Sequence, residues 1–274
     1  MNANGYLTRL AETALVRELE EVNIRRSLES LRAKIDTHFA GTLLAGKPIK
    51  RHFTFGSYAR GTMLPRSMDE LSDIDYMVVF ADSDAKPQTY LDRLRRFVEA
   101  RYPRSDIAQS TPTIVLSLDH IKFELVPAIE GLWGGLKIPM RSSGYQTWQD
   151  TEPNGFNERL TEKNKNNGNL IKPLVRVLKY WNAMNKYPFE SYNLEQDVVN
   201  HSPLTLLFFE AKLWDWFSTF IRSLNSSWGD SAYRRDAITR AQNLVSEIAT
   251  HESRGEEVHA QRKLERLLPP VAAR

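Results

Sequence analysis

The first half of the chain has the apolar pattern of a sheet. Residues 76–80 form a short run of β-branched and aromatic side chains after a polar loop, which predicts a buried strand. In residues 114–129, apolar and polar positions alternate on both sides of Asp119 and His120. This alternation predicts a β-hairpin with a two-residue turn, with Glu124 on the polar face of its second strand.

Helical spacing flanks this region. Residues 15–35 place apolar side chains at the intervals of an amphipathic helix, which we expect to pack across the back of a core. A second helix is expected over residues 91–98, and it should end near Pro103. The apolar stripe expected for the first helix consists of Leu15, Leu19, Val22, Leu28, Leu31 and Ile35.

The second half of the chain contains several segments with helical spacing. Residues 170–181 are apolar along one face, and residues 204–217 predict an apolar helix with Ser202 as its N-cap. Residues 232–268 predict two charged helices that Gly255 separates.

Composition limits the classes of protein. The 274 residues are 41% hydrophobic and 26% charged, which is ordinary for a soluble globular chain. No apolar run approaches the roughly 18 residues of a membrane span, and residues 1–10 lack the pattern of a secretory signal, so we predict a cytoplasmic protein without membrane partners. The chain has no cysteine, so disulfides and thiol chemistry are excluded and a metal would need oxygen or imidazole ligands.

Charge changes this picture little. The formal net charge is +3, which is compatible with phosphate-bearing partners but is also typical of an ordinary solvated surface. We therefore predict no stable DNA binding.

The candidate chemistry begins with two aspartates at the start of the predicted buried strand. Because side chains in a strand alternate between faces, Asp73 and Asp75 should point to the same side. Neighbouring carboxylates repel each other, and a hard divalent cation is a common reason to hold them together. Mg²⁺ favours one or two carboxylates plus the phosphates of a substrate.

A phosphate-binding turn is predicted just before these aspartates. Gly56 permits positive φ and a close approach of backbone to a ligand. Ser57 should lie where a strand gives way to a helix, with its hydroxyl and the following amides free to bind an anion, and Arg60 adds charge one turn later.

Gly56-Ser57 is followed, about one loop later, by Asp73-x-Asp75. This order of motifs resembles the nucleotidyltransferase superfamily of DNA polymerase beta-like enzymes. The sequence of residues 56–62, GSYARGT, with SDID at residues 72–75, is more specifically similar to the bacterial cGAS/DncV-like nucleotidyltransferases, the CD-NTases with the SMODS domain. The resemblance implies an α+β, bilobal fold. It has a mixed-sheet palm lobe with a long N-terminal bracing helix in residues 1–165, and a mostly helical C-terminal lobe in residues 166–274.

The resemblance also implies a third acidic residue on a nearby strand before a Val-Pro, and Glu124 stands in that context. Asp73, Asp75 and Glu124 would then bind two Mg²⁺ ions, for which Mn²⁺ can substitute, and Glu124 would help activate the attacking hydroxyl. An alternative stays open, in which Glu124 pairs with Lys122 on the same face or is a simple edge-strand residue.

Two further residues are assigned by the resemblance. The sequence of residues 174–181 is similar to that of a family helix whose lysine contacts the triphosphate of the donor nucleotide. Lys179 is the matching position. Ser202 matches a family serine that meets the same triphosphate. A solvated role for Lys179 and a capping role for Ser202 stay open at this point.

The function implied is transfer of a nucleotide from NTPs to make a cyclic or linear oligonucleotide signal in antiphage defence, read by a separate effector protein. One alternative gives the same chemistry a macromolecular acceptor, such as a tRNA end or a partner protein. Another is an inactive module that binds nucleotides or a partner. Nothing in the sequence predicts the oligomeric state.

Overall fold

The structure is a computed structural model, and it describes residues 1–40, 48–110, 112–131, 134–140, 142, 144, 146–207 and 210–271. The chain forms two compact units. A sheet unit consists of Arg17–Met63 and Ser72–Glu158, and a helical unit consists of Met1–Val16, Leu64–Leu71 and Arg159–Arg274. The sequence-based division at residue 165 stays a proposal.

The sheet unit contains one mixed, seven-stranded sheet with the path β1-β2-β5-β4-β3, to which β6 and β7 add beyond β5. Strands β2 and β5 are parallel, and the other pairs are antiparallel. This arrangement confirms the predicted α+β class, and the predicted hairpin is present as β4 and β5, closed by a hydrogen bond from the Leu118 N–H to the Ile121 carbonyl. The strands are β1 (Ile49–Thr54), β2 (Ile74–Phe80), β3 (Asp106–Ser110), β4 (Thr113–Ser117), β5 (Lys122–Glu130), β6 (Leu136–Pro139) and β7 (Trp148–Thr151).

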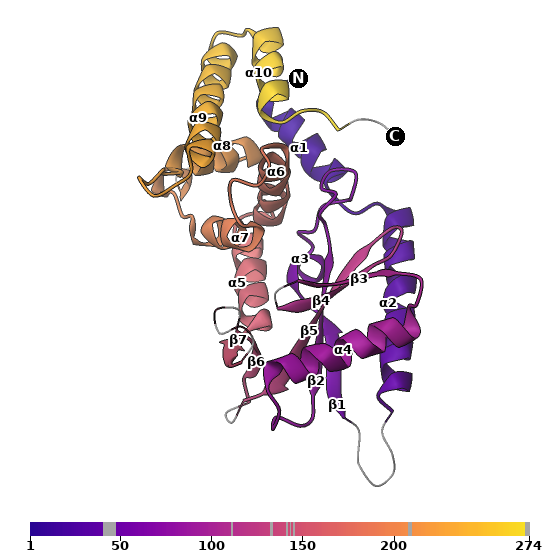
Figure 1. The fold of residues 1–274 in the computed structure, drawn as a ribbon. Coiled ribbons are helices and arrows are strands. Elements are labelled where there is room, and N and C mark those ends of the chain that lie inside the picture. Colours follow the sequence, from indigo (N-terminus) through magenta and orange to yellow (C-terminus); the bar gives the residue numbers. More distant parts are fainter. Residues whose placement is uncertain are drawn as a thin grey trace. The chain divides into compact units, whose positions relative to one another are not determined.

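Helices cover one face of the sheet. Helix α4 (Pro87–Arg101) crosses it in contact with β3, β4, β5 and β6, and α2 (Glu18–His38) contacts α4 (Figure 1). Phe80 of β2 points to this side, where its ring lies 4.9 Å from Tyr90 of α4 and 5.9 Å from Phe39 after α2. The opposite face carries a second cluster around Met77 and Val79 of β2, together with Ala128 and Leu136. Asp75 has the same strand parity as Met77, so it belongs to the face without α2 and α4.

The helix predicted over residues 15–35 is real but shifted. Helix α2 begins at Glu18 and buries Ile24, Leu28, Leu31 and Ile35. The other three members of the predicted stripe are wrong, because Leu15, Leu19 and Val22 are 48%, 82% and 45% exposed. At about 100° per residue, a position two residues before Ile24 lies on the far side of the helix, so one stripe cannot contain both.

The helical unit is built around α6 (Ile171–Met184), ten of whose side chains are buried. Helices α9 (Ala232–Ser253) and α10 (Glu257–Leu267) run side by side as a hairpin (Figure 1), and Gly255 turns between them with φ of +71°, as predicted. The remaining helices are α1 (Ala3–Thr13), α5 (Pro153–Asn166), α7 (Ser191–Asn200), the 3₁₀ turn Leu204–Leu207 and α8 (Leu213–Ser223), and α5 begins within the sheet unit.

One predicted helix of this unit is wrong in its extent. The sequence predicts a continuous helix over residues 204–217 capped by Ser202, but Leu204–Leu207 is a 3₁₀ turn and residues 210–212 are not helical. Helix α8 instead begins at Leu213, where the Asp215 side chain accepts a hydrogen bond from the Lys212 N–H. Helices α1 and α7 and strand β3 were not predicted.

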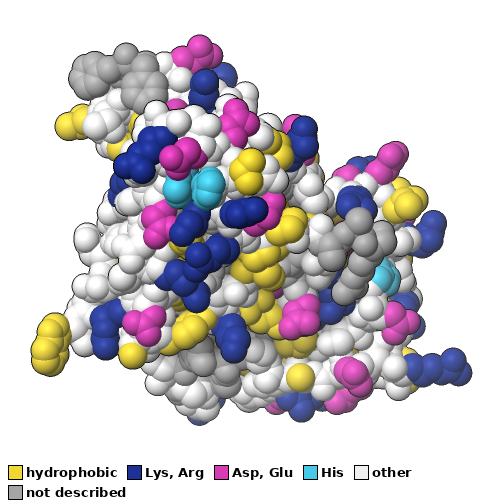
Figure 2. All heavy atoms as spheres, turned by 90° about the horizontal axis from the view of Figure 1, so that it is seen from above, with side chains coloured by type: hydrophobic (Ala, Val, Ile, Leu, Met, Phe, Trp, Pro, Cys, Tyr) yellow, Lys and Arg dark blue, Asp and Glu magenta, His cyan; other side chains and the backbone are white. Residues whose placement is uncertain are grey.

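The surface carries charges of both signs. On the face in Figure 2, Lys and Arg side chains are interspersed with Asp and Glu and with apolar groups, in keeping with the small net charge of +3. Within the described ranges, none of the helices has the length and apolar character that crossing a membrane requires.

Candidate active site

Strand register brings the predicted acidic residues to one end of the sheet. Strands β2 and β5 are parallel, and Asp75 of β2 is the direct partner of Glu124 of β5. Asp73 lies just before β2, while β1 runs antiparallel to β2 and ends at Thr54. The amino ends of β2 and β5 therefore meet the carboxyl end of β1, and a hydrogen bond of 3.0 Å from the Phe55 N–H to the Asp75 carbonyl continues this pairing.

At this end of the sheet, which we call the sheet corner, Gly56 lets the backbone of the turn lie directly against the Asp75 side chain. Its φ is +70°, and a Cβ added there would lie 1.7 Å from Oδ2 of Asp75. An alanine would thus combine left-handed backbone strain with a collision against a carboxylate. Glycine is required because the Asp75 side chain lies directly against the turn.

Glu124 is held by contacts on both of its oxygens. The Thr113 hydroxyl donates to Oε2 at 3.4 Å, and the ammonium of Lys122 lies 3.6 Å from Oε1. The same ammonium lies 3.3 Å from Oδ2 of Asp73. The side chains of Asp73, Lys122 and Glu124 are 28%, 27% and 22% exposed, so this cluster is only partly shielded from solvent.

The pKa of the Glu124 carboxyl is raised from its ordinary value. Burial is the largest cause, the negative charge of Asp73 follows, and Lys122 acts in the opposite direction. The corner therefore concentrates negative charge that a cation would stabilise.

Ser57 and Arg60 lie on α3 (Gly56–Arg60), the short helix predicted after the turn. The Ser57 carbonyl accepts hydrogen bonds from the N–H groups of Thr62 and Met63, at 2.9 and 3.1 Å, and these bonds close the segment back on itself. Arg60 is buried, and its guanidinium lies 5.1 Å from the centre of the Phe156 ring. The structure thus gives Arg60 a packed position, and its predicted contact with phosphate stays a prediction.

Lys179 belongs to the helical unit, on α6, and it is not a solvated lysine. Its ammonium lies 3.3 Å from Oε1 of Glu195 on α7, and the two side chains are 6% and 1% exposed. This buried ion pair gives Lys179 a partner that the sequence did not predict. The predicted contact with a triphosphate is not tested by this geometry.

Ser202 also lies in the helical unit. Lys163 of α5 donates to the Ser202 hydroxyl at 2.6 Å and to the His201 carbonyl at 2.8 Å. These bonds fix the backbone that precedes the 3₁₀ turn, and burial lowers the pKa of Lys163. The role of Ser202 toward a nucleotide stays a prediction.

Sequence reasoning missed part of this chemistry. It offered Lys122 as a partner of Glu124, and the structure confirms that contact, but the second contact with Asp73 was not anticipated. The alternative that placed Glu124 on an edge strand is wrong, because β5 lies between β2 and β4. Thr113, Lys163 and Glu195 carried no sequence signal, since each acts through a partner that is distant along the chain.

Comparison with known proteins identifies the family. Residues 1–164, more than half of the chain, match the Second Messenger Oligonucleotide or Dinucleotide Synthetase domain, SMODS. The chain belongs to this family. The sequence-based resemblance is thereby confirmed.

Two curated relatives of this SMODS protein are named as synthases. A probable cyclic nucleotide synthase of Bacillus cereus (strain VD146) is 30% identical over 197 residues, which cover 58% of this chain and 57% of that protein. A cyclic AMP-AMP-AMP synthase of Acinetobacter sp. (strain ATCC 27244 / 9458) is 25% identical over 186 residues, covering 65% and 52%. The chain thus spans little more than half the length of these relatives.

Solved structures share the fold of this SMODS protein. CdnC of E. coli MS115-1 in complex with HORMA-deltaN has a TM-score of 0.71 at 15% identity, with 97% of each chain covered. The CD-NTase CdnG of Bradyrhizobium diazoefficiens in complex with GTP has a TM-score of 0.68 at 13% identity, covering 96% of this chain and 97% of that one. At such identities the likeness shows the fold, and it confirms the predicted nucleotidyltransferase architecture.

The family uses divalent metal ions for catalysis, and the residues of the corner fit such an ion. Carboxylate oxygens are the ligands that hard cations prefer, and Asp73, Asp75 and Glu124 supply them at one end of the sheet. Within the part of the chain that the structure describes, no three acidic or histidine side chains already form a metal-binding group. Asp73 and Glu124, which share one ammonium, and Asp75, which pairs in register with Glu124, suit an ion whose remaining ligands come from substrate phosphates.

Proposed function

We propose that this protein transfers a nucleoside monophosphate from an NTP to a hydroxyl group, with release of pyrophosphate, and so makes a cyclic or linear oligonucleotide second messenger. The observation that carries the proposal is the corner where Asp75 pairs in register with Glu124 and lies against Gly56. The names of the two curated relatives support a synthase of cyclic nucleotides. Structures of similar fold that contain ATP or GTP support NTPs as substrates.

Each site residue has a role in the proposed reaction. Asp73, Asp75 and Glu124 would hold two Mg²⁺ ions, with Mn²⁺ as a substitute, which would supply positive charge beside the phosphates. The amides near Gly56 and the hydroxyl of Ser57 hold the triphosphate of the donor. Arg60, Lys179 and Ser202 are proposed as further contacts with the nucleotide.

The transfer itself is a substitution at phosphorus. The oxygen of the acceptor hydroxyl forms a bond to the α-phosphorus, and the bond from that phosphorus to the bridging oxygen of pyrophosphate breaks. Glu124 would help to activate the hydroxyl and accept its proton, because its carboxylate lies at the same end of the sheet as Asp73 and Asp75. We further propose a role in antiphage defence, with a separate effector protein that reads the product.

The decisive experiment incubates the purified protein with labelled NTPs and Mg²⁺ or Mn²⁺, and follows pyrophosphate release and products by mass spectrometry. Small cyclic or linear oligonucleotides are the expected products. Adducts on RNA or on a protein would instead support a macromolecular acceptor. Nucleotide binding without turnover, whatever the acceptor offered, would contradict the proposal.

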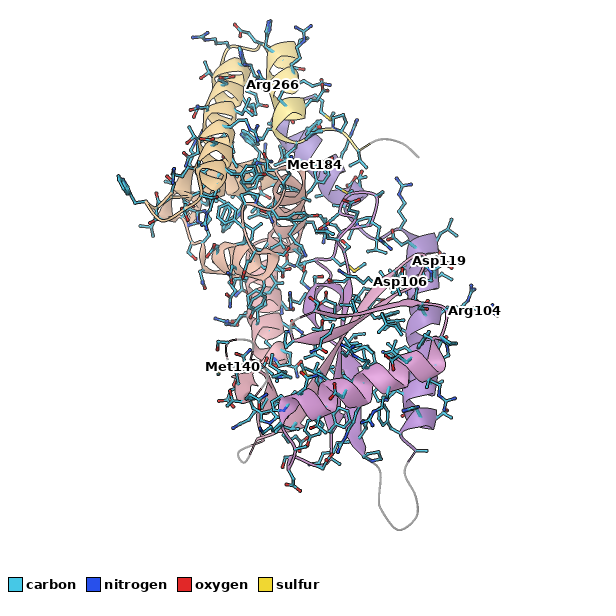
Figure 3. The ribbon with its side chains drawn as sticks, in the orientation of Figure 1. Arg104, Asp106, Asp119, Met140, Met184 and Arg266 are labelled. Atoms are coloured by element: carbon cyan, nitrogen blue, oxygen red, sulfur yellow. The ribbon has the colours of Figure 1, made fainter. Side chains whose placement is uncertain are left out.

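Two variants tie the activity to the site. Asp75→Asn should lower the rate of pyrophosphate release by at least about a thousandfold while the protein stays folded, because the ligand charge is lost. Asp119→Asn is the matched control, since Asp119 is an exposed aspartate of the same sheet, in the turn between β4 and β5 (Figure 3). Equal losses in both variants would contradict the assignment.

A further inference from the structure

Lys122 lies beside two of the three proposed metal ligands, Asp73 and Glu124. It is the first residue of β5, two positions before Glu124, so both side chains belong to the same face of the strand. Its ammonium lies 3.3 Å from Asp73 and 3.6 Å from Glu124, and it thereby bridges two carboxylates that come from different segments. The contact is built by strand pairing, because Lys122 faces Ser117 in the β4–β5 hairpin while Phe123 pairs with Ile74 of β2.

The charge balance at this corner makes Lys122 more than an ordinary surface lysine. Asp73, Asp75 and Glu124 together carry up to three negative charges, and two of them share the single ammonium of Lys122. At 3.3 and 3.6 Å these contacts are ion pairs, whose attraction holds the two carboxylates near the ammonium as well as neutralising them. A divalent ion bound by the same oxygens would repel the ammonium across a few ångströms.

Partial exposure allows the Lys122 ammonium to leave these carboxylates. The Lys122 side chain is 27% exposed, so its ammonium can reach water by rotation about the flexible bonds of the side chain. A buried lysine has no such route. Lys122 is therefore suited to exchange with another cation.

We propose that Lys122 is a resident counter-cation, a positioning residue that holds Asp73 and Glu124 in place and competes with the divalent metal for them. It sets the metal concentration at which the site loads. This inference rests on the proposed function, because it assigns a regulation to the same carboxylates. No assignment of this lysine follows from family membership.

The test measures Mn²⁺ binding without nucleotide, by the loss of the free Mn²⁺ signal in electron paramagnetic resonance. Lys122→Met removes the charge and keeps most of the length of the side chain, and it should tighten Mn²⁺ binding about five- to tenfold. Lys122→Arg keeps the charge and should leave the affinity near that of the wild type. Lys50→Met is the matched control, since Lys50 lies on β1 of the same sheet and pairs with Glu130 at 2.8 Å.

A second readout separates positioning from simple folding. In EDTA, Lys122→Met should melt at a lower temperature than the wild type, because the carboxylates lose their counter-charge, and saturating Mn²⁺ should remove that difference. A purely structural role would leave the difference in place. Unchanged or weaker Mn²⁺ affinity in Lys122→Met would overturn the inference, as would equal tightening in Lys50→Met.

These results are distinguishable from a failure of the proposed function. If the wild type neither binds Mn²⁺ nor releases pyrophosphate, the metal-dependent reaction itself is wrong. If the wild type binds Mn²⁺ and the variants bind it equally, only the role of Lys122 is wrong.

Discussion

Two lysine–carboxylate contacts of this protein have nearly the same length and opposite surroundings. Lys122 lies 3.3 Å from Asp73 in the sheet unit, with both side chains more than a quarter exposed. Lys179 lies 3.3 Å from Glu195 in the helical unit, and these side chains are 6% and 1% exposed. Distance alone does not distinguish them, but access to water does.

The difference in burial indicates which of the two contacts can change during function. A buried charge that loses its partner has no solvent to replace it, so a pair such as Lys179 and Glu195 holds its two helices together. A partly exposed pair such as Lys122 and Asp73 contributes less to stability than a buried one, because water and salt can replace either partner. We therefore expect the Lys122 contact to exchange with a metal ion, and the Lys179–Glu195 pair between α6 and α7 to persist.

The largest expected effect comes from breaking the buried pair. Glu195→Ala leaves the ammonium of Lys179 buried without its carboxylate, and it should lower the free energy of unfolding by about 3–5 kcal/mol, measured by urea titration. Glu190→Ala, an exposed position just before α7, is the control and should change stability little. A loss below about 1 kcal/mol in Glu195→Ala would show that the pair is not a structural one.

Lys179→Met extends this experiment to the nucleotide. Combined with Glu195→Leu it should recover most of the stability, because neither charge is then left unpaired. A folded Lys179→Met variant with an increased KM for NTP would support the predicted contact with the triphosphate, and an unchanged KM would restrict Lys179 to the ion pair.

The next effect is at the glycine turn of the sheet corner. Gly56→Ala should reduce pyrophosphate release at least about a hundredfold, because its Cβ would displace the Asp75 carboxylate from its position. Gly61→Ala is matched to it, since both glycines have φ of +70° but no atom lies within 4 Å of a Cβ added at Gly61. Both variants should lose about 1–2 kcal/mol of stability from backbone strain, and only the first should lose activity. Similar activities would argue that the close approach has no catalytic meaning.

A smaller effect is expected where an uncharged group orients a carboxylate. Thr113→Val removes the hydroxyl that donates to Oε2 of Glu124 at 3.4 Å, and it should lower the transfer rate about three- to tenfold with KM unchanged. Thr37→Val is the control, because that hydroxyl bonds the Ala33 carbonyl on α2. A rate equal to that of the wild type would mean that the Lys122 contact orients Glu124 alone.

The smallest expected effect is on the pH dependence of folding stability, and it comes from His201 in the helical unit. Burial, and then the charge of Lys163, lower the pKa of His201, so the native protein keeps this ring neutral. The unfolded chain binds the proton near pH 6.5, so stability should decrease as the pH falls below that value. His201→Asn should make the stability less dependent on pH between about 7.5 and 5.5, and the exposed His120→Asn should not. Equal slopes in the wild type and in His201→Asn would contradict this assignment.

Local sequence was enough for the elements that bury a continuous face. Strand β2 and the β4–β5 hairpin were predicted because alternation within a few residues reports burial directly. The helix over residues 15–35 was only half right, since an apolar side chain such as Leu19 fits a helical spacing and still faces solvent. Helix α1 was missed, although Ala3, Leu7, Leu10 and Ala11 follow a helical period.

For the site, the sequence determined the residue types and their order along the chain. Gly56, Ser57, Asp73 and Asp75 lie within one loop and its flanking strands, so their chemistry could be derived from spacing, and the Val-Pro context added Glu124. The family followed from the same motifs. These conclusions needed no knowledge of distant contacts.

Only the tertiary structure decided which charges meet. The parallel pairing of β2 with β5 places Asp75 opposite Glu124 and brings Lys122 to Asp73, and the packing of α7 against α6 buries Glu195 beside Lys179. Strand register and helix packing depend on the summed burial of many side chains, which no short motif contains. One lysine is therefore partly exposed and the other buried, although the sequence alone shows two similar basic residues.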